Sequence, residues 1–197
     1  SHIETVSISS DGEYIVAGTE DDKVYLFDKD SSTPLWSYNA GSNVNDVAIS
    51  SDGEYIVIGS ANDKVYLFNK SNSTPIWSYE ADNTVYSVSI SADGDYIAAG
   101  FEGEVFLFGK DSNTPIWYTT DVVNGNPRSV SISADGEYIT VCTEAGTPTV
   151  YLFGNDSNTP MWEYELGSSG SSSSYATEIS ANGKQIVVGS KNDKVKR

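Results

Sequence analysis

The feature that most constrains this chain is an internal repeat of about forty residues. An Asp-Gly turn followed by an acidic residue and a tyrosine recurs along the chain, with a weakened copy ending at Gln185. With the fifth residue of this segment as marker, the successive steps are 41, 41, 42 and 47 residues. A tryptophan preceded by proline and one apolar residue recurs in the same phase, at Trp36, Trp77, Trp117 and Trp162. Two markers in phase indicate tandem structural units.

Each unit has the pattern of four short strands. Residues 6–9 alternate apolar and polar side chains, and an Asp-Gly pair then predicts a tight turn, because glycine adopts a positive φ at no steric cost. Residues 14–18 are mainly apolar, and residues 24–27 are apolar on both faces. A Ser/Asn/Thr-Pro turn precedes the fourth strand, where a missing N–H costs little.

Strands that are apolar on both faces must be covered on both sides. Four-strand units stacked face to face around an axis satisfy this need, and no segment has a helical apolar period. The sequence therefore predicts an all-β protein: one β-propeller domain of four-stranded antiparallel blades, about five in number with the last incomplete. The expected repeats are approximately 1–40, 41–80, 81–120, 121–166 and a partial 167–197.

The fifth unit supplies only a first strand (176–180) and a second strand (186–190) before residues 194–197. An uncovered strand edge invites pairing with another chain, so closed propellers usually consist of whole blades. Three readings stay open: a segment of a longer chain, a ring completed by another copy, or a five-bladed ring with one thin blade. The second reading predicts self-association through the incomplete fifth blade.

The segment from the Asp-Gly turn through the third strand, residues 10–18 and 22–28, resembles a WD-repeat blade. Phe27-Asp28 stands where that family has Trp-Asp, whereas later units carry Asn69, Gly109 and Gly154 after the phenylalanine. The family's Gly-His signature is absent from this sequence.

The other half of the unit resembles the quinoprotein, or pyrroloquinoline-quinone-type, repeat. That family has an apolar Tyr-Ala-Leu-Asp strand, a Thr-Gly turn and Leu-Trp, and here residues 24–27 lead to Pro34-Leu35-Trp36. The resemblance covers almost the whole chain and implies the propeller fold, which hosts many unrelated functions. Quinone-dependent dehydrogenation would require more blades, calcium ligands and stacking partners, and such residues do not map onto this sequence.

Charge restricts the partners. Acidic residues number 28 against 11 basic ones, which gives a formal net charge of −17. Nucleic acid and anionic lipid would be repelled, whereas a cation or a protein partner with a basic surface would be attracted. No apolar run approaches the roughly 18–20 residues that cross a membrane, so we expect no membrane insertion.

Residues that could perform catalysis are scarce. His2 is the only histidine and Cys142 the only cysteine, so triad catalysis and histidine- or cysteine-based metal sites are not expected. Cys142 takes the place of a glycine in the other units, so it is expected to be a small structural residue. Paired-carboxylate hydrolysis stays open, although no pair stands out. We expect no enzyme activity, no cofactor and no metal.

Comparison of the units with one another separates regular turns from variable loops. The second-to-third and fourth-to-first connections vary, and in a propeller both fall on one face, as expected for a binding face on a fixed scaffold. Tolerated insertion is the competing reading. The acidic residues of this predicted partner-binding face are Glu20, Asp21, Asp22, Glu80, Asp82, Glu102, Glu104, Asp121 and Glu144. Their abundance is better explained by solubility than by calcium binding, since no calcium-loop spacing occurs.

Two repeated residue types are interpreted as structural. The aspartate of each Asp-Gly turn is expected to accept hydrogen bonds from its own turn, and the tryptophans are expected to pack between blades. The aspartates are Asp11, Asp52, Asp93 and Asp135.

The leading hypothesis is a non-catalytic scaffold that binds a protein through its variable face. The alternatives are a fragment of a larger quinoprotein-like or lyase-type propeller enzyme, and a structural repeat of a microbial cell-surface protein. Two glycosylation-type triplets, at residues 72–74 and 155–157, tilt the expected location toward the exterior or cell surface of a microbe.

Overall fold

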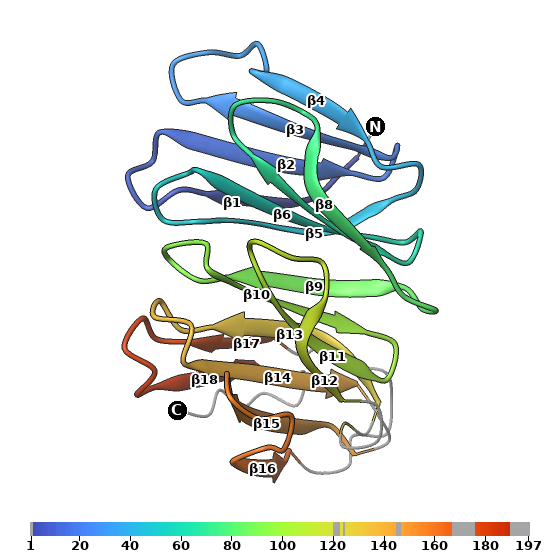
Figure 1. The fold of residues 1–197 in the computed structure, drawn as a ribbon, viewed down its shortest axis with the longest axis vertical. Helices are drawn as coiled ribbons and strands as arrows, with labels where there is room; N and C mark the ends of the chain where they lie inside the picture. Colours follow the sequence, from blue (N-terminus) through green and yellow to red (C-terminus); the bar gives the residue numbers. More distant parts are fainter. Residues whose placement is uncertain (1, 120–122, 124, 145–146, 167–175, 190–197) are drawn as a thin grey trace.

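The computed structural model describes residues 2–119, 123, 125–144, 147–166 and 176–189. These residues form strands and turns, arranged as four four-stranded antiparallel sheets and one two-stranded sheet (Figure 1). The all-β class and the propeller of four to five blades predicted from the repeat are thereby confirmed. Within the described ranges no helix is long and apolar enough to span a lipid bilayer.

The strands follow the chain in the order of the blades. Blade 1 contains β1 (Ile3–Ile8), β2 (Tyr14–Thr19), β3 (Lys23–Asp28) and β4 (Trp36–Asn39). Blade 2 contains β5 (Val44–Ile49), β6 (Tyr55–Ser60), β7 (Lys64–Asn69) and β8 (Pro75–Glu80). Blade 3 contains β9 (Val85–Ile90), β10 (Tyr96–Phe101), β11 (Glu104–Gly109) and β12 (Pro115–Thr119). Blade 4 contains β13 (Asn126–Ile132), β14 (Tyr138–Glu144), β15 (Thr149–Gly154) and β16 (Trp162–Glu165), and the partial blade contains β17 (Ala176–Ile179) and β18 (Ile186–Gly189).

The hydrophobic core lies between blades, because each second and third strand is apolar on both faces. Val16 and Leu26 of blade 1 pack in one cluster with Val47, Ile56 and Phe68 of blade 2. Equivalent clusters join blade 2 to blade 3 and blade 3 to blade 4. The first strands neighbour one another in succession, β1 with β5, β5 with β9, β9 with β13 and β13 with β17, so they line the propeller axis.

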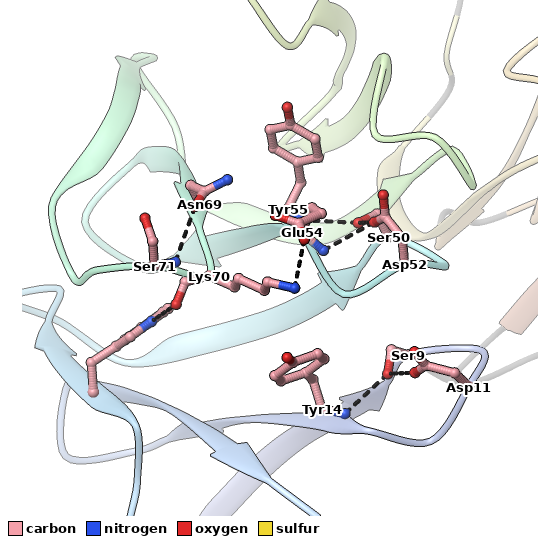
Figure 2. A network of polar contacts seen from close by, with 11 residues as sticks. Ser9, Asp11, Tyr14, Ser50, Asp52, Glu54, Tyr55, Asn69, Lys70 and Ser71 are labelled. Carbon is pink, nitrogen blue, oxygen red and sulfur yellow. Dashed lines mark hydrogen bonds and ion pairs between the residues drawn. The ribbon is translucent and has the colours of Figure 1, made fainter.

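The Asp-Gly turns confirm the structural interpretation of their aspartates. In blade 1 the Asp11 carboxylate accepts the Ser9 hydroxyl at 2.5 Å and the Glu13 amide at 3.0 Å, and the Ser9 oxygen accepts the Tyr14 amide at 3.0 Å. Figure 2 shows this arrangement beside its equivalent in blade 2, around Asp52. One carboxylate oxygen of each aspartate, Oδ1, is therefore already engaged within the turn.

The described residues form an open arc rather than a closed ring (Figure 1). Ile3, Val6 and Ile8 of β1 are 64%, 63% and 59% exposed, whereas the same position as Val6 is only 4% exposed at Val47 and at Val88. The difference arises because the preceding blade covers each interior first strand, and no described blade precedes β1. Among the described residues the arc therefore ends in an uncovered face at blade 1.

Candidate partner-binding rim

The variable loops lie together on one rim of the arc. We call this the loop rim: the turns between second and third strands and the connections from each fourth strand to the next first strand. Backbone hydrogen bonds join the two sets, from the Ala40 amide to the Asp22 carbonyl at 2.7 Å and from the Ala81 amide to the Asp63 carbonyl at 2.9 Å. The opposite rim, with the Asp-Gly turns and the turns between third and fourth strands, is called the turn rim.

The turns of the loop rim need unusual backbone conformations. Asp22 and Asp63 have φ of 69° and 67°, and Gly103 takes the corresponding place in blade 3 with φ of 76°. Short polar residues and glycine tolerate this left-handed region better than other types. The acidic residues of these turns therefore also satisfy a backbone requirement.

Two of the predicted face residues have a cationic neighbour. Glu80 Oε2 lies 3.1 Å from Lys64 Nζ, and Glu144 Oε2 accepts a hydrogen bond from the Nε of Arg128 at 2.5 Å. The charge of these two residues is partly neutralised within the chain, which reduces what they offer to a partner. A third, Glu20, lies with its Oε2 3.0 Å from His2 Nδ1.

The remaining predicted residues form the uncompensated part of the rim. Asp21, Asp82 and Glu102 are exposed, and within the described ranges none of them makes an ion pair. Asp22 and Glu104 are half-buried on the same rim. Asp121 lies outside the described residues.

The pKa shifts on this rim follow from local contacts. A hydrogen bond from Glu4, and then one from His2, holds the pKa of Glu20 below its usual value, while the same Glu4–Glu20 contact raises the pKa of Glu4. The Thr19 hydroxyl lowers the pKa of Asp21. Burial, and then the negative charge of Asp82, raises the pKa of Glu104. Like charges thus crowd where the end of blade 2 meets blade 3.

Neither cysteine nor histidine forms a reactive centre with its described neighbours. Cys142 is fully buried with Val150 and Val188, and burial raises the pKa of its thiol to about 12. This agrees with the interpretation of Cys142 as a small structural residue. His2 is exposed and contacts Glu20. Among the described residues no group of three or more His, Cys, Asp or Glu side chains is placed to hold a metal ion.

A polar cleft of about 580 Å³ lies along the axis, lined by the first strands, and it was not predicted from the repeat pattern. Asp46 joins three blades there: its carboxylate accepts hydrogen bonds from the hydroxyls of Thr5 at 3.1 Å and Ser87 at 2.9 Å, and from the Val88 amide at 2.9 Å. Burial nevertheless raises the pKa of Asp46. The sequence does contain a signal for this contact, because the positions equivalent to Asp46 in other repeats are the hydroxyl residues Thr5, Ser87 and Ser129.

Across the cleft wall, Arg128 lies over the ring of Tyr86, with its guanidinium carbon 4.2 Å from the ring centroid. The same guanidinium binds Glu144. Arg128 thereby links blade 4 to blade 3 through Tyr86 and to the loop rim through Glu144. Its positive charge is engaged by these two side chains.

Blades of this kind, with a Val-Tyr-Leu-Phe third strand and a Pro-x-Trp entry to the fourth, define a propeller of pyrroloquinoline-quinone-like repeats. A family model described as outer membrane protein assembly factor BamB matches residues 4–196, so the chain belongs to this family. Comparison with curated proteins gives no match. The quinoprotein-type resemblance is therefore supported, whereas the WD-repeat resemblance stays a prediction.

Proposed function

We propose that this chain is a non-catalytic β-propeller scaffold whose loop rim binds a protein partner with a basic surface. The observation that carries the proposal is the segregation of the two rims. The turn rim is regular and its aspartates are engaged within their turns, whereas the loop rim varies between blades and exposes Asp21, Asp82 and Glu102 without cationic partners among the described residues.

The family supports a role in protein interaction. The matching model carries the name of an outer membrane protein assembly factor. A propeller presents loops from several blades on one face, so a partner can contact several blades at once. A basic partner would remove the repulsion between Asp82 and Glu104, which supplies part of the driving force.

The reactive residues support a non-catalytic role. The thiol of Cys142 is buried and its pKa is raised, which opposes thiolate formation. His2 lies at the exposed start of the chain and contacts Glu20. A fragment of a propeller enzyme and a structural surface repeat stay alternative hypotheses, and no contact among the described residues favours either.

A charge-matched pair of variants tests the proposal. The loop-rim variant carries Asp21→Lys, Asp82→Lys and Glu102→Lys, and the turn-rim variant carries Asp111→Lys, Glu137→Lys and Asp156→Lys. Both have the same net charge, so long-range attraction is equal and only its location differs. The probe is a synthetic lysine-rich peptide, titrated by calorimetry at low and physiological salt.

We expect the loop-rim variant to bind the peptide more weakly than the turn-rim variant at both salt concentrations. Equal binding by the two variants would mean that the peptide responds to net charge alone. This result would contradict the assignment of the loop rim as the binding face. Circular dichroism checks that both variants keep the strand content of the parent chain.

A further inference from the structure

The first strand of every complete blade contains a β-bulge at the same place. In β5 the pairing with β6 shifts between Val44 and Asp46, so Asn45 is an extra residue in that strand. The extra residues at the equivalent bulges of β1, β9 and β13 are Glu4, Tyr86 and Arg128. All four extra residues line the axial cleft. Bulges re-aim side chains and are frequent beside functional sites, so this geometry places one selected side chain from each blade at the axis.

The bulge is also the position at which the first strands differ most. Two residues after it every complete blade has a valine, and four residues after it every complete blade has an isoleucine: Val6, Val47, Val88 and Val130, and Ile8, Ile49, Ile90 and Ile132. The bulge itself carries a carboxylate, an amide, a phenol and a guanidinium in turn. Variation at one cleft-lining position, in strands that otherwise largely repeat, favours a role in recognition over a role in the fold.

The bulge residues of the interior blades are held in place by contacts between blades. The Asn45 Nδ2 donates to the Val85 carbonyl of blade 3 at 2.8 Å, which leaves the Asn45 Oδ1 as an acceptor. The Arg128 guanidinium lies over the Tyr86 ring, and its Nε binds Glu144. In the ranges that the structure describes, its two terminal amino groups have no acceptor. These side chains are therefore ordered and still have hydrogen-bonding capacity to offer.

The wall of the cleft adds serine hydroxyls. The Ser89 Oγ accepts the Ile132 amide at 3.2 Å, and among the described residues its own proton has no acceptor. Ser7 takes the same position in β1 and also lines the cleft. A hydroxyl can donate one hydrogen bond while it accepts others, so these serines can donate to a ligand.

The charges of the cleft restrict what it can bind. Three carboxylates line it, those of Glu4, Asp46 and Glu178, against the one guanidinium of Arg128, so an anionic ligand would be repelled. The Asp46 carboxylate already accepts three hydrogen bonds from blades 1 and 3, and Glu178 accepts the Ser131 hydroxyl at 3.0 Å. No group of described His, Cys, Asp or Glu side chains is placed to hold a metal ion. An apolar ligand would leave the polar walls without hydrogen bonds.

We propose that the axial cleft is a binding site for a neutral polyhydroxy ligand of the size of a mono- or disaccharide. The terminal amino groups of Arg128 and the Ser89 hydroxyl donate to ligand oxygens, and the Asn45 Oδ1 accepts from a ligand hydroxyl. A planar guanidinium presents neighbouring N–H groups that match two adjacent hydroxyls. The apolar ring of Tyr86 packs on C–H groups of the ligand. A cleft of about 580 Å³ is within the range of small-molecule sites.

The site is separate from the charges that carry the function proposed above. Asp21, Asp82 and Glu102 are not among the residues that line the cleft. Binding of the lysine-rich peptide and binding of a sugar can therefore succeed or fail independently of each other.

The test titrates the full chain, labelled with ¹⁵N, with maltose, cellobiose and trehalose in turn. We expect at least one sugar to bind saturably with a Kd below about 10 mM. The NMR shifts should concentrate in the first strands and the Asn45 side-chain amide. Tyr86→Ser and Arg128→Lys should each raise the Kd about tenfold, because the first removes the ring and the second replaces the planar donor pair by a point charge.

Tyr118→Ser is the matched control for Tyr86→Ser. Tyr118 is an exposed tyrosine of the same blade that lies outside the cleft, so its loss should leave the Kd unchanged. Thermal unfolding of each variant checks that the fold is kept, and the location of the shifts in the parent chain tests the site without any substitution.

Three results would overturn the proposal. The first is the absence of saturable shifts with all three sugars at about 50 mM, a concentration well above the expected Kd. The second is a set of shifts outside the first strands, or a Kd that neither Tyr86→Ser nor Arg128→Lys changes. The third is tighter binding of the diamine putrescine than of any sugar, with shifts in the cleft, which would assign the site to a cationic ligand.

Discussion

The two rims of the arc are made by the same repeats and yet differ in how far the repeat determines them. On the turn rim each turn donates one backbone hydrogen bond to the next turn, and the lengths stay between 3.0 and 3.1 Å. The donors and acceptors are Ser10 to Ser51, Ser51 to Ala92, Ala92 to Ala134, and Ala134 to Ala181. On the loop rim, side-chain contacts such as Glu20–His2 and the ion pair Glu144–Arg128 are each particular to one blade.

The difference teaches where this fold tolerates change. The turn rim connects blades, so a substitution there alters an interface as well as a turn. The loop rim contains connections within each blade and from one blade to the next, and neighbouring connections are joined by single backbone bonds such as Ala40 to Asp22. Substitutions are therefore expected to destabilise the fold less on the loop rim than on the turn rim. The following experiments measure this difference, from the largest expected effect to the smallest.

The largest effect is expected for Gly94→Ala on the turn rim. Gly94 has φ of 78°, and a Cβ at this position would lie 2.4 Å from the Tyr55 ring of the preceding blade. The left-handed conformation costs about 1–2 kcal/mol and the overlap about 1–3 kcal/mol more. We expect the free energy of unfolding, measured by urea titration, to fall by about 3 kcal/mol.

Gly12→Ala is the matched control for this variant. Gly12 has nearly the same φ, 73°, but no atom lies within 4 Å of its added Cβ, because no described blade precedes blade 1. It should lose only the conformational part, about 1–2 kcal/mol. If both variants lose the same amount, the packing of tyrosine on glycine contributes nothing and the turn rim is not a set of blade contacts.

The next effect concerns the serine that precedes each turn. Ser91 is fully buried, donates to Asp93 at 2.6 Å and accepts the Tyr96 amide at 3.0 Å. Ser91→Ala leaves the part-buried Tyr96 amide unpaired, which costs about 1–3 kcal/mol. The same contacts around Ser180 of the partial blade are exposed, so Ser180→Ala should cost less than about 1 kcal/mol. Equal losses in thermal unfolding would contradict the distinction between interior and end turns.

Much of this arrangement was accessible from the sequence, because it depends on local chemistry repeated in every unit. The strand order, the turn role of Asp11 and the packing role of Trp77 follow from patterns that each repeat contains. The uncovered face of β1 could not be predicted, because Ile3 and Val6 have the same apolar pattern as the covered Val44 and Val47. Whether a neighbouring blade covers a residue is not encoded in that residue's own strand.

The location of the loop rim could be predicted from the sequence. Which of its carboxylates are paired within the chain could not. Loop positions follow from the topology, whereas the pairing of Glu144 depends on the direction of Arg128, which no repeat pattern determines. The role of Asp46 likewise depends on hydroxyls contributed by two other blades. Contacts between repeats therefore could not be predicted from the sequence pattern of a single repeat.

A smaller effect is expected from acid on the turn rim. Hydrogen bonds from the Ser133 hydroxyl and the Glu137 amide hold the pKa of Asp135 below its usual value of 3.8. The unfolded state therefore binds a proton more readily than the folded state, so this stabilisation is present above pH 3.8 and is lost as pH falls through the lowered pKa. Asp135→Asn should reduce the difference between urea midpoints at pH 7 and pH 3. An unchanged difference would show that this carboxylate does not contribute to acid sensitivity.

The smallest effect should appear on the loop rim, where the pKa of Glu104 is shifted in the opposite direction. Burial and the charge of Asp82 raise this pKa, so the folded state holds the proton more tightly and the repulsion is present at neutral pH. Asp82→Asn should lower the pKa of Glu104 in an NMR titration and stabilise the chain by less than about 0.5 kcal/mol, an effect that salt screens. Asp111→Asn on the turn rim should leave that titration unchanged. If Asp82→Asn also leaves it unchanged, burial alone raises the pKa, and the like charges of the loop rim are too far apart to make it a focused site for a basic partner.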